Sequence, residues 1–182
     1  MARKRDRAIE VFFYTGVEVV PKDVVRVKFA STVTEVAPYT FVNCHSLVEV
    51  VLKEAILMIG ECAFRGCSSL ISITLPSTVR EVGDRAFGGC IKLREVVLNE
   101  GLLAIGEIAF YGCTSLESIT LPSTVREVGG DRAFGGCVKL REVVLNEGLL
   151  TISDRAFYGC HSLESITLPS TVREVGDRAF GG

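Results

Sequence analysis

The chain has 182 residues, seven cysteines and a formal net charge of -2. This length suits one domain or a run of small stacked units. The apolar fraction of 48% and the charged fraction of 23% are typical of a folded protein, which argues against general disorder. The small net charge argues against nucleic acid as a partner. No apolar run reaches about 18 residues, so no membrane-spanning helix is expected.

Residues 1–8 are predicted to form a basic, flexible tail, with four of the first seven residues being arginine or lysine. A solvated terminus is the usual role of such a cluster, and a localisation signal or a contact with acidic lipid is the alternative. The apolar stretch that follows contains Glu10 and lacks a small-residue cleavage site, so it does not resemble a signal peptide. A cytoplasmic location is therefore expected, with the cysteines present as thiols.

Residues 9–23 are predicted to cap the N-terminal end of the fold. The segment from Ile9 to Val20 is apolar and is interrupted by Thr15-Gly16, which favours a small β-hairpin. A cap is expected because the first unit of a repeat array would otherwise expose its core.

Residues 24–182 form an array with a period of 23 residues, interrupted by one inserted glycine at Gly129-Gly130. Cysteine follows the repeated phenylalanine by three residues, and leucine follows that cysteine by three more. The phenylalanines stand at Phe41, Phe64, Phe87, Phe110, Phe134, Phe157 and Phe180. A unit of this length is too short for paired helices or for a propeller blade. The period therefore predicts a solenoid in which each repeat forms one rung.

Each rung begins with a strand, as in the segment from Leu70 to Leu75. Alternation places Leu70, Ile73 and Leu75 inward, with Ser72 and Thr74 outward. Proline ends the strand because it has no N–H for the ladder.

The second half of each rung is predicted to return the chain to the next strand. Val79 and Val82 supply two more inward side chains. Asp84 is a plausible N-cap for a short helical turn over residues 85–87, after which Gly88-Gly89 releases the chain.

Two kinds of rung alternate along the array. Proline rungs carry a Ser-Ile-Thr-Leu-Pro-Ser-Thr segment, and asparagine rungs carry Glu-Val-Val-Leu-Asn-Glu-Gly. Residues 165–182 repeat residues 72–89 without a change, which indicates tandem duplication. An array that grows by duplication is better suited to present a surface than to build one unique pocket.

The stretch from Cys67 to Phe87 resembles the BspA-like leucine-rich repeat (LRR), whose pattern is roughly C-x-x-L-x-x-I-x-L-P-x-x-V-x-x-I-G-x-x-A-F. The resemblance covers about residues 24–182. It implies a right-handed, curved solenoid of about seven rungs, with a parallel sheet on the concave side and short helical or 3-10 turns. It also implies protein binding, since some members look like surface adhesins and others are intracellular. The Asn-Glu-Gly turns depart from the pattern and put the uniformity of the turn face in doubt.

The last repeat stops one residue before the cysteine that the period requires. We therefore expect an incomplete repeat, belonging to a fragment or a truncated array. An uncapped C-terminal rung offers end-to-end self-association as a possible contact.

The candidate binding residues are the outward side chains of the predicted concave sheet. Rungs stack at roughly 4.8 Å, so equivalent positions form columns along the solenoid. The columns mix carboxylates, arginines and β-branched residues, which fits either a protein-binding face or simple sheet stabilisation. The candidates are Glu49, Val51, Ser72, Thr74, Arg94, Glu95, Val97, Glu117, Thr120, Arg141, Glu142, Val144, Glu164 and Thr167.

Two other sets of side chains are expected to contribute to the surface. Arg94, Glu117, Arg141 and Glu164 alternate in sign, which favours modest cross-strand ion pairs. Elsewhere leucines (Leu57, Leu103, Leu150) alternate with arginines (Arg80, Arg126, Arg173). These leucines either form a contact patch or are covered by the arginine stems.

No catalytic, cofactor or metal site is predicted. A cysteine every 23 residues is not metal-site spacing, so the cysteine column is interpreted as buried small side chains. Cys62 lies outside that column and is the thiol expected to be most exposed. His45 and His161 are five rungs apart, roughly 24 Å, and are expected on surface loops. The sequence contains no phosphate-binding loop and no dinucleotide fingerprint.

The sequence therefore favours a non-enzymatic protein-interaction module that binds a protein ligand on its concave sheet. The alternative is a structural or adhesive array that associates with itself.

Overall fold

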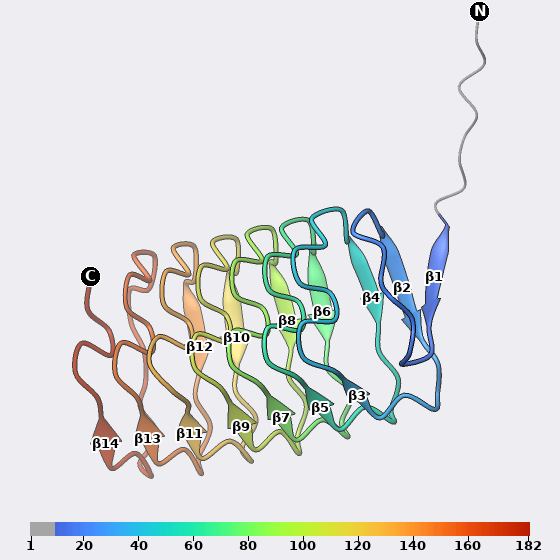
Figure 1. Cartoon of the computed structure of the whole chain (residues 1–182). Helices are drawn as coiled ribbons and strands as arrows, with labels where there is room; N and C mark the ends of the chain where they lie inside the picture. Colours follow the sequence, from blue (N-terminus) through green and yellow to red (C-terminus); the bar gives the residue numbers. More distant parts are fainter. Residues whose placement is uncertain (1–9) are drawn as a thin grey trace, which may run out of the picture.

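The computed structural model describes residues 10–182 and shows a parallel β-solenoid of about seven turns. The strands form two rows along the stack, and the N- and C-terminal rungs lie at its opposite ends (Figure 1). The predicted tail, residues 1–8, lies outside the described residues.

One row contains the longer strands of the rungs, and every observed pairing within it is parallel. We call the outward side of this row the long-strand face; it carries the predicted binding residues. The row consists of β1 (Val11–Tyr14), β2 (Arg26–Phe29), β4 (Glu49–Val51), β6 (Ser72–Thr74), β8 (Glu95–Val97), β10 (Ser118–Thr120) and β12 (Glu142–Val144).

The second row consists of two-residue strands and pairs in parallel as well. We call its outward side the short-strand face. The row consists of β3 (Glu35–Val36), β5 (Met58–Ile59), β7 (Glu81–Val82), β9 (Ala104–Ile105), β11 (Glu127–Val128), β13 (Thr151–Ile152) and β14 (Glu174–Val175). Its hydrogen bonding is interrupted between β9 and β11, next to the inserted glycine.

The core lies between the two rows and follows the predicted pattern. Leu70, Ile73 and Leu75 are buried on one side, and Val79 and Val82 are buried on the other. Among the described residues no polar or charged residue is buried. The inward and outward alternation of each rung is therefore confirmed.

The phenylalanine column runs through this core as a continuous stack. From Phe41 to Phe180 the rings are nearly parallel, with neighbouring centroids 5.1 to 5.5 Å apart. Each inner ring packs against a ring above and a ring below, a spacing at which aromatic pairs attract one another.

The cysteine column supports the same stack. The Cys90 thiol donates a hydrogen bond to the carbonyl of Phe64 in the preceding rung, with an Sγ–O distance of 3.2 Å. Cys67 and Cys113 make the equivalent bonds to Phe41 and Phe87. The column thus fastens each rung to the one before it, in agreement with its predicted structural role.

The short helical turn predicted after Gly83 is not confirmed, since the described residues contain no helix. Arg85 has a φ of 55°, in the left-handed region, and its counterparts in the other rungs also have positive φ. The backbone N–H groups of Arg85 and Phe87 donate to Glu107 and Ala109 of the next rung, both at 2.8 Å. These donors are therefore unavailable for bonds within the turn. Asp84 is not an N-cap, because its carboxylate accepts from the N–H of Glu107 in the next rung.

The predicted N-terminal hairpin is replaced by a parallel strand. The described part of residues 9–23 contains one strand, β1, and it pairs in parallel with β2. Thr15-Gly16 does not reverse the chain into a hairpin, although Gly16 has a φ of 106°. The residues after β1 instead connect it to the parallel strand β2. The division of the chain into tail, cap and array remains a prediction.

The two kinds of rung are joined by two kinds of polar contact. Between a proline rung and the asparagine rung that follows it, the side-chain amide of Asn99 donates a hydrogen bond back to the backbone carbonyl of Leu75, at 2.7 Å. Between that asparagine rung and the next proline rung, the Glu100 carboxylate accepts hydrogen bonds from the N–H and the hydroxyl of Ser123, both at 3.0 Å. The departures from the family pattern thus serve as complementary parts of the stack.

Phe110→Ala is expected to lower the free energy of unfolding by about 3–5 kcal/mol, because it removes a fully buried ring and leaves a cavity. Urea denaturation followed by circular dichroism measures this change. The neighbouring exposed Tyr111 provides the control, and Tyr111→Ala should cost no more than about 0.5 kcal/mol. Equal losses in the two variants would contradict the stacked column.

Acid should weaken the contacts made by Glu100 and Glu147. Hydrogen bonds donated by the Ser123 and Ser170 N–H groups lower the pKa of these carboxyls from the usual 4.5. Because the pKa of these carboxyls is lower in the folded state than in the unfolded state, they stabilise the protein above pH 4.5. This contribution is lost as the pH falls through the folded-state pKa. The double variant Glu100→Gln, Glu147→Gln should therefore melt below the wild type at neutral pH, with the difference shrinking in acid. A difference in melting temperature that does not change with pH would refute this assignment.

Candidate interaction surface

The long-strand face brings most of the predicted binding residues into one continuous surface. In β6 the buried Ile73 lies between the exposed Ser72 and Thr74, and β4, β8, β10 and β12 likewise have a buried central residue between two outward ones. Cross-strand pairing places Ser72 beside Glu95 and Thr74 beside Val97. Of the fourteen candidates, Val51 and Val97 are half-buried and the other twelve are exposed.

Arg94, Glu117 and Arg141 directly precede β8, β10 and β12, whereas the last two candidates, Glu164 and Thr167, belong to a rung without a long strand. The Ser165–Thr167 segment occupies the strand position of its rung but has no strand pairing. Both residues are exposed, so they extend the surface without belonging to the sheet.

Charges on this face are mostly not paired with one another. Among residues 10–182 the one ion pair on the face joins Arg26 to Glu49, with an Nε–Oε2 distance of 3.1 Å. The predicted cross-strand pairs of Arg94, Glu117, Arg141 and Glu164 are not formed. For Arg94 and Glu117 a cause is visible, because β8 and β10 are not hydrogen-bonded neighbours. These side chains are consequently available for charges on a partner.

A groove lies at the C-terminal end of the face, with a volume of about 490 Å³. It runs between β12 and residues 165–169, and its lining includes Glu142, Val144 and Leu168. Its position coincides with an interruption in the hydrogen bonding of the sheet.

The leucine and arginine columns occupy the loops beside the short-strand face. Leu57 and Leu103 are 51% and 54% exposed, so the arginine stems cover them only in part. Arg80 and Arg126 instead donate to backbone carbonyls of nearby turns, at 3.4 and 3.3 Å. This side therefore presents isolated apolar side chains between cations.

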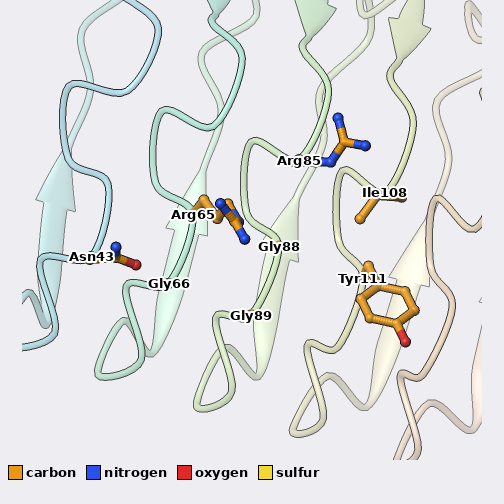
Figure 2. Close-up of a pocket in the computed structure, with 8 residues that line it drawn as sticks. All are labelled: Asn43, Arg65, Gly66, Arg85, Gly88, Gly89, Ile108 and Tyr111. Carbon is orange, nitrogen blue, oxygen red and sulfur yellow. The ribbon is translucent and has the colours of Figure 1, made fainter.

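A shallow notch of about 360 Å³ opens on the turns of neighbouring rungs (Figure 2). Gly88 is one of its lining residues, and the equivalent positions in the two neighbouring rungs are occupied by Arg65 and Tyr111, which also line it. Its lining contains no carboxylate, imidazole or thiol that could serve as a general base or nucleophile. Sequence reasoning did not single out this notch, although the alternation of glycine with bulky residues at one repeat position was visible.

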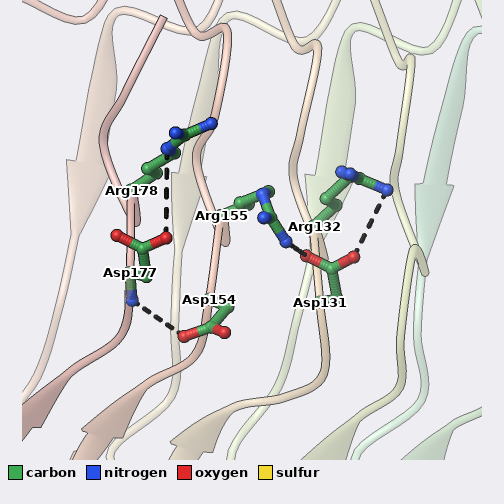
Figure 3. A network of polar contacts seen from close by, with 6 residues as sticks. All are labelled: Asp131, Arg132, Asp154, Arg155, Asp177 and Arg178. Carbon is green, nitrogen blue, oxygen red and sulfur yellow. Dashed lines mark hydrogen bonds and ion pairs between the residues drawn. The ribbon is translucent and has the colours of Figure 1, made fainter.

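The left-handed turns carry a polar network near the inserted glycine (Figure 3). The Asp131 carboxylate pairs with Arg132 at 3.3 Å and with Arg155 at 3.4 Å. In the last rungs Asp154 accepts from the N–H of Asp177 at 2.8 Å, the same contact that Asp84 makes earlier in the array. The network links consecutive turns.

The prediction that Cys62 is the most exposed thiol is wrong. Its side chain is 2% exposed, and all seven cysteines are free and buried. Arginines occupy the same repeat position elsewhere and reach solvent because they are long, whereas the short cysteine side chain remains covered. Desolvation, followed by the nearby Glu61 carboxylate, raises the pKa of the Cys62 thiol.

The two histidines are exposed, as predicted. The His45 ring lies 3.4 Å from the Ser68 hydroxyl. In the described part of the chain no three histidine, cysteine, aspartate or glutamate side chains are grouped as a metal site would require. No helix long and apolar enough to span a membrane occurs among residues 10–182.

Stacked parallel strands with buried leucine, phenylalanine and cysteine columns define a leucine-rich-repeat solenoid. The family model described as "BspA type Leucine rich repeat region (6 copies)" matches residues 22–131 and 129–182. The chain therefore belongs to the BspA-type leucine-rich repeat family. No curated protein matches it closely enough to count as a relative.

Solved structures of bacterial leucine-rich repeat proteins share the fold. A Bacteroides ovatus protein is 36% identical with a TM-score of 0.81, over 87% of this chain and 41% of its own length. The T. pallidum leucine-rich repeat protein is 37% identical with a TM-score of 0.78, over 82% of this chain and 72% of that protein. A leucine-rich cell surface protein of Faecalibacterium prausnitzii is 25% identical with a TM-score of 0.51, over 87% of this chain and 51% of that protein.

The cysteine column should resist alkylation in the native protein. Burial raises the pKa of the Cys67 thiol to about 12 and that of Cys160 to about 11, so the reactive thiolate is scarce at pH 8. Iodoacetamide labelling followed by mass spectrometry should show slow modification of all seven cysteines, with rapid labelling in urea. Fast and selective labelling of Cys62 in the native protein would contradict its burial.

Proposed function

We propose that this chain is a non-enzymatic protein-interaction module that binds a partner protein on the long-strand face. The observation that carries the proposal is the continuous surface of outward side chains from β4 to β12, whose charges are largely unpaired among themselves. Protein interfaces use such extended, mixed surfaces, whereas small molecules require enclosed pockets.

The repetition of this surface favours an extended partner. Glu95 and Glu142 occupy equivalent positions two rungs apart, and Val97 and Val144 accompany them on the same strands. A partner that places basic groups at this interval would meet each carboxylate in turn. Such charge complementarity increases specificity and the association rate.

Reversal of Glu95 and Glu142 to arginine tests this proposal. The protein ligand would be captured on the immobilised chain, identified and purified, and its affinity measured by calorimetry. The double variant should bind at least about tenfold more weakly, because like charges would face one another in the complex. The matched control reverses Glu81 and Glu127, two exposed glutamates on the short-strand face. Unchanged affinity in the first variant, or equal losses in both, would refute the choice of face.

A structural or adhesive array is the second candidate. Its support is the likeness to the Faecalibacterium prausnitzii protein, which is described as a cell surface protein. An adhesive array would be displayed on the cell surface, whereas the interaction module is proposed to lie in the cytoplasm. The seven free thiols are compatible with such a reducing compartment. Protease treatment of intact cells separates the two, since a displayed array is cleaved and a cytoplasmic one is protected.

A further inference from the structure

Two equivalent glycine pairs in successive proline rungs are packed differently. The pairs are Gly88-Gly89 and Gly135-Gly136, each directly after a stacked phenylalanine. Cβ atoms placed on the second pair would lie 3.1 and 3.9 Å from the ring of Tyr111 in the preceding rung. A Cβ atom on Gly88 would have backbone atoms as its three nearest neighbours, and one on Gly89 would meet only Gly66 backbone within contact distance. An aromatic ring therefore packs on the second pair, and no ring packs on the first.

The difference arises at one repeat position. The rung before Gly135 has Tyr111 at this position, whereas the rung before Gly88 has Arg65. Arg65 lines the notch of about 360 Å³ beside Gly88-Gly89 instead of filling it (Figure 2). Because the rungs are equivalent, the packing of Tyr111 on its glycine pair shows which kind of group the notch can accommodate. That group is a single aromatic side chain.

The notch also carries positive charge without a counter-charge in its lining. Arg65 and Arg85 line it from neighbouring rungs, and no carboxylate lines it. Among residues 10–182 neither arginine forms an ion pair, whereas Arg132, the equivalent of Arg85 two rungs later, pairs with Asp131 at 3.3 Å. Arginine forms its strongest hydrogen bonds with anionic groups such as carboxylates. The charge of the notch therefore fits an acidic ligand.

We propose that the notch binds the aromatic side chain of an acidic segment of a partner protein. The aromatic ring packs against the Gly88-Gly89 backbone between Arg65 and Tyr111, and carboxylates beside it in the segment pair with Arg65 and Arg85. The notch is shallow, so it suits a side chain held by a longer segment better than a free small molecule. Aromatic and arginine side chains dominate the binding energy of many protein interfaces. This site lies on the turns, away from the long-strand face, and goes beyond the proposed function.

A short acidic peptide provides the probe. Fluorescence anisotropy at low ionic strength would measure the affinity of fluorescein-labelled Gly-Glu-Glu-Tyr-Glu-Glu-Gly for the whole chain. Saturable binding is expected. Replacing the peptide tyrosine by alanine, or its glutamates by glutamine, should weaken binding at least about fivefold, because the ring or the ion pairs are lost. Unlabelled phenylacetate, which has a ring and a carboxylate but no peptide, should compete far less strongly than the unlabelled peptide.

Arg65→Tyr places the probe in competition with the chain itself. A tyrosine here should pack on Gly88-Gly89 as Tyr111 packs on its own glycine pair, so the affinity should fall at least about tenfold. Arg65→Ala removes the same cation but leaves the notch open, and should cost only about threefold. Arg80→Ala, which removes an exposed arginine beside the short-strand face, is the matched control and should leave the affinity unchanged.

Four outcomes would overturn the proposal: no binding of the peptide, equal binding of the alanine peptide, equal affinities of Arg65→Tyr and Arg65→Ala, or phenylacetate competing as strongly as the peptide. Circular dichroism of each variant checks that the solenoid is folded. Tyrosine at this repeat position is already present in other rungs, at Tyr111 and Tyr158, so Arg65→Tyr is expected to fold. Binding of a partner by the long-strand face is measured separately and does not depend on the result.

Discussion

Stacking of the phenylalanine rings constrains the rest of this molecule. Each inner ring must lie about 5.2 Å from the rings of two neighbouring rungs. The chain satisfies this requirement by returning to the same position every 23 residues and by fastening each rung through the cysteine thiol and the turn backbone. The inserted glycine in the rung of Phe134 shows the tolerance of this arrangement. The extra residue is absorbed at Gly129 and Gly130, and the stack between Phe110 and Phe134 is undisturbed.

Because the inward positions are committed to the stack, differences between rungs are concentrated outside the core. Proline and asparagine rungs differ in their turns and in the outward residues of their strands, while their buried leucine, cysteine and phenylalanine positions are the same. The two kinds of turn are complementary: the asparagine amide of an asparagine rung donates to the proline rung before it, and the glutamate carboxylate of the same rung accepts from the proline rung after it. The surface therefore repeats every two rungs, which would offer the proposed partner a regular series of equivalent contacts.

Much of this architecture could be predicted from the sequence, because burial leaves a periodic pattern. The inward residues and the outward columns follow from spacing, and the resemblance to the repeat family implies the parallel sheet. Most of the errors share a different cause, since they depend on contacts between rungs; the burial of Cys62 instead reflects the shortness of its side chain. Arg85 adopts a left-handed conformation because its N–H bonds to the next rung, and a local pattern of Gly-Asp-Arg-Ala-Phe cannot reveal that partner. Likewise, Thr15-Gly16 signals a turn but does not reveal whether the strand before it pairs with the next strand in parallel or antiparallel.

Buried columns build the fold, and the long-strand face is proposed to bind the partner. Hydrogen–deuterium exchange of the chain, with and without its purified protein ligand, tests this division most directly. Slower exchange on binding should be concentrated in β6, β8, β10 and β12 and in the turns that follow them. Protection confined to β5, β7, β9 and β11, with exchange in the long strands unchanged, would contradict binding on the long-strand face.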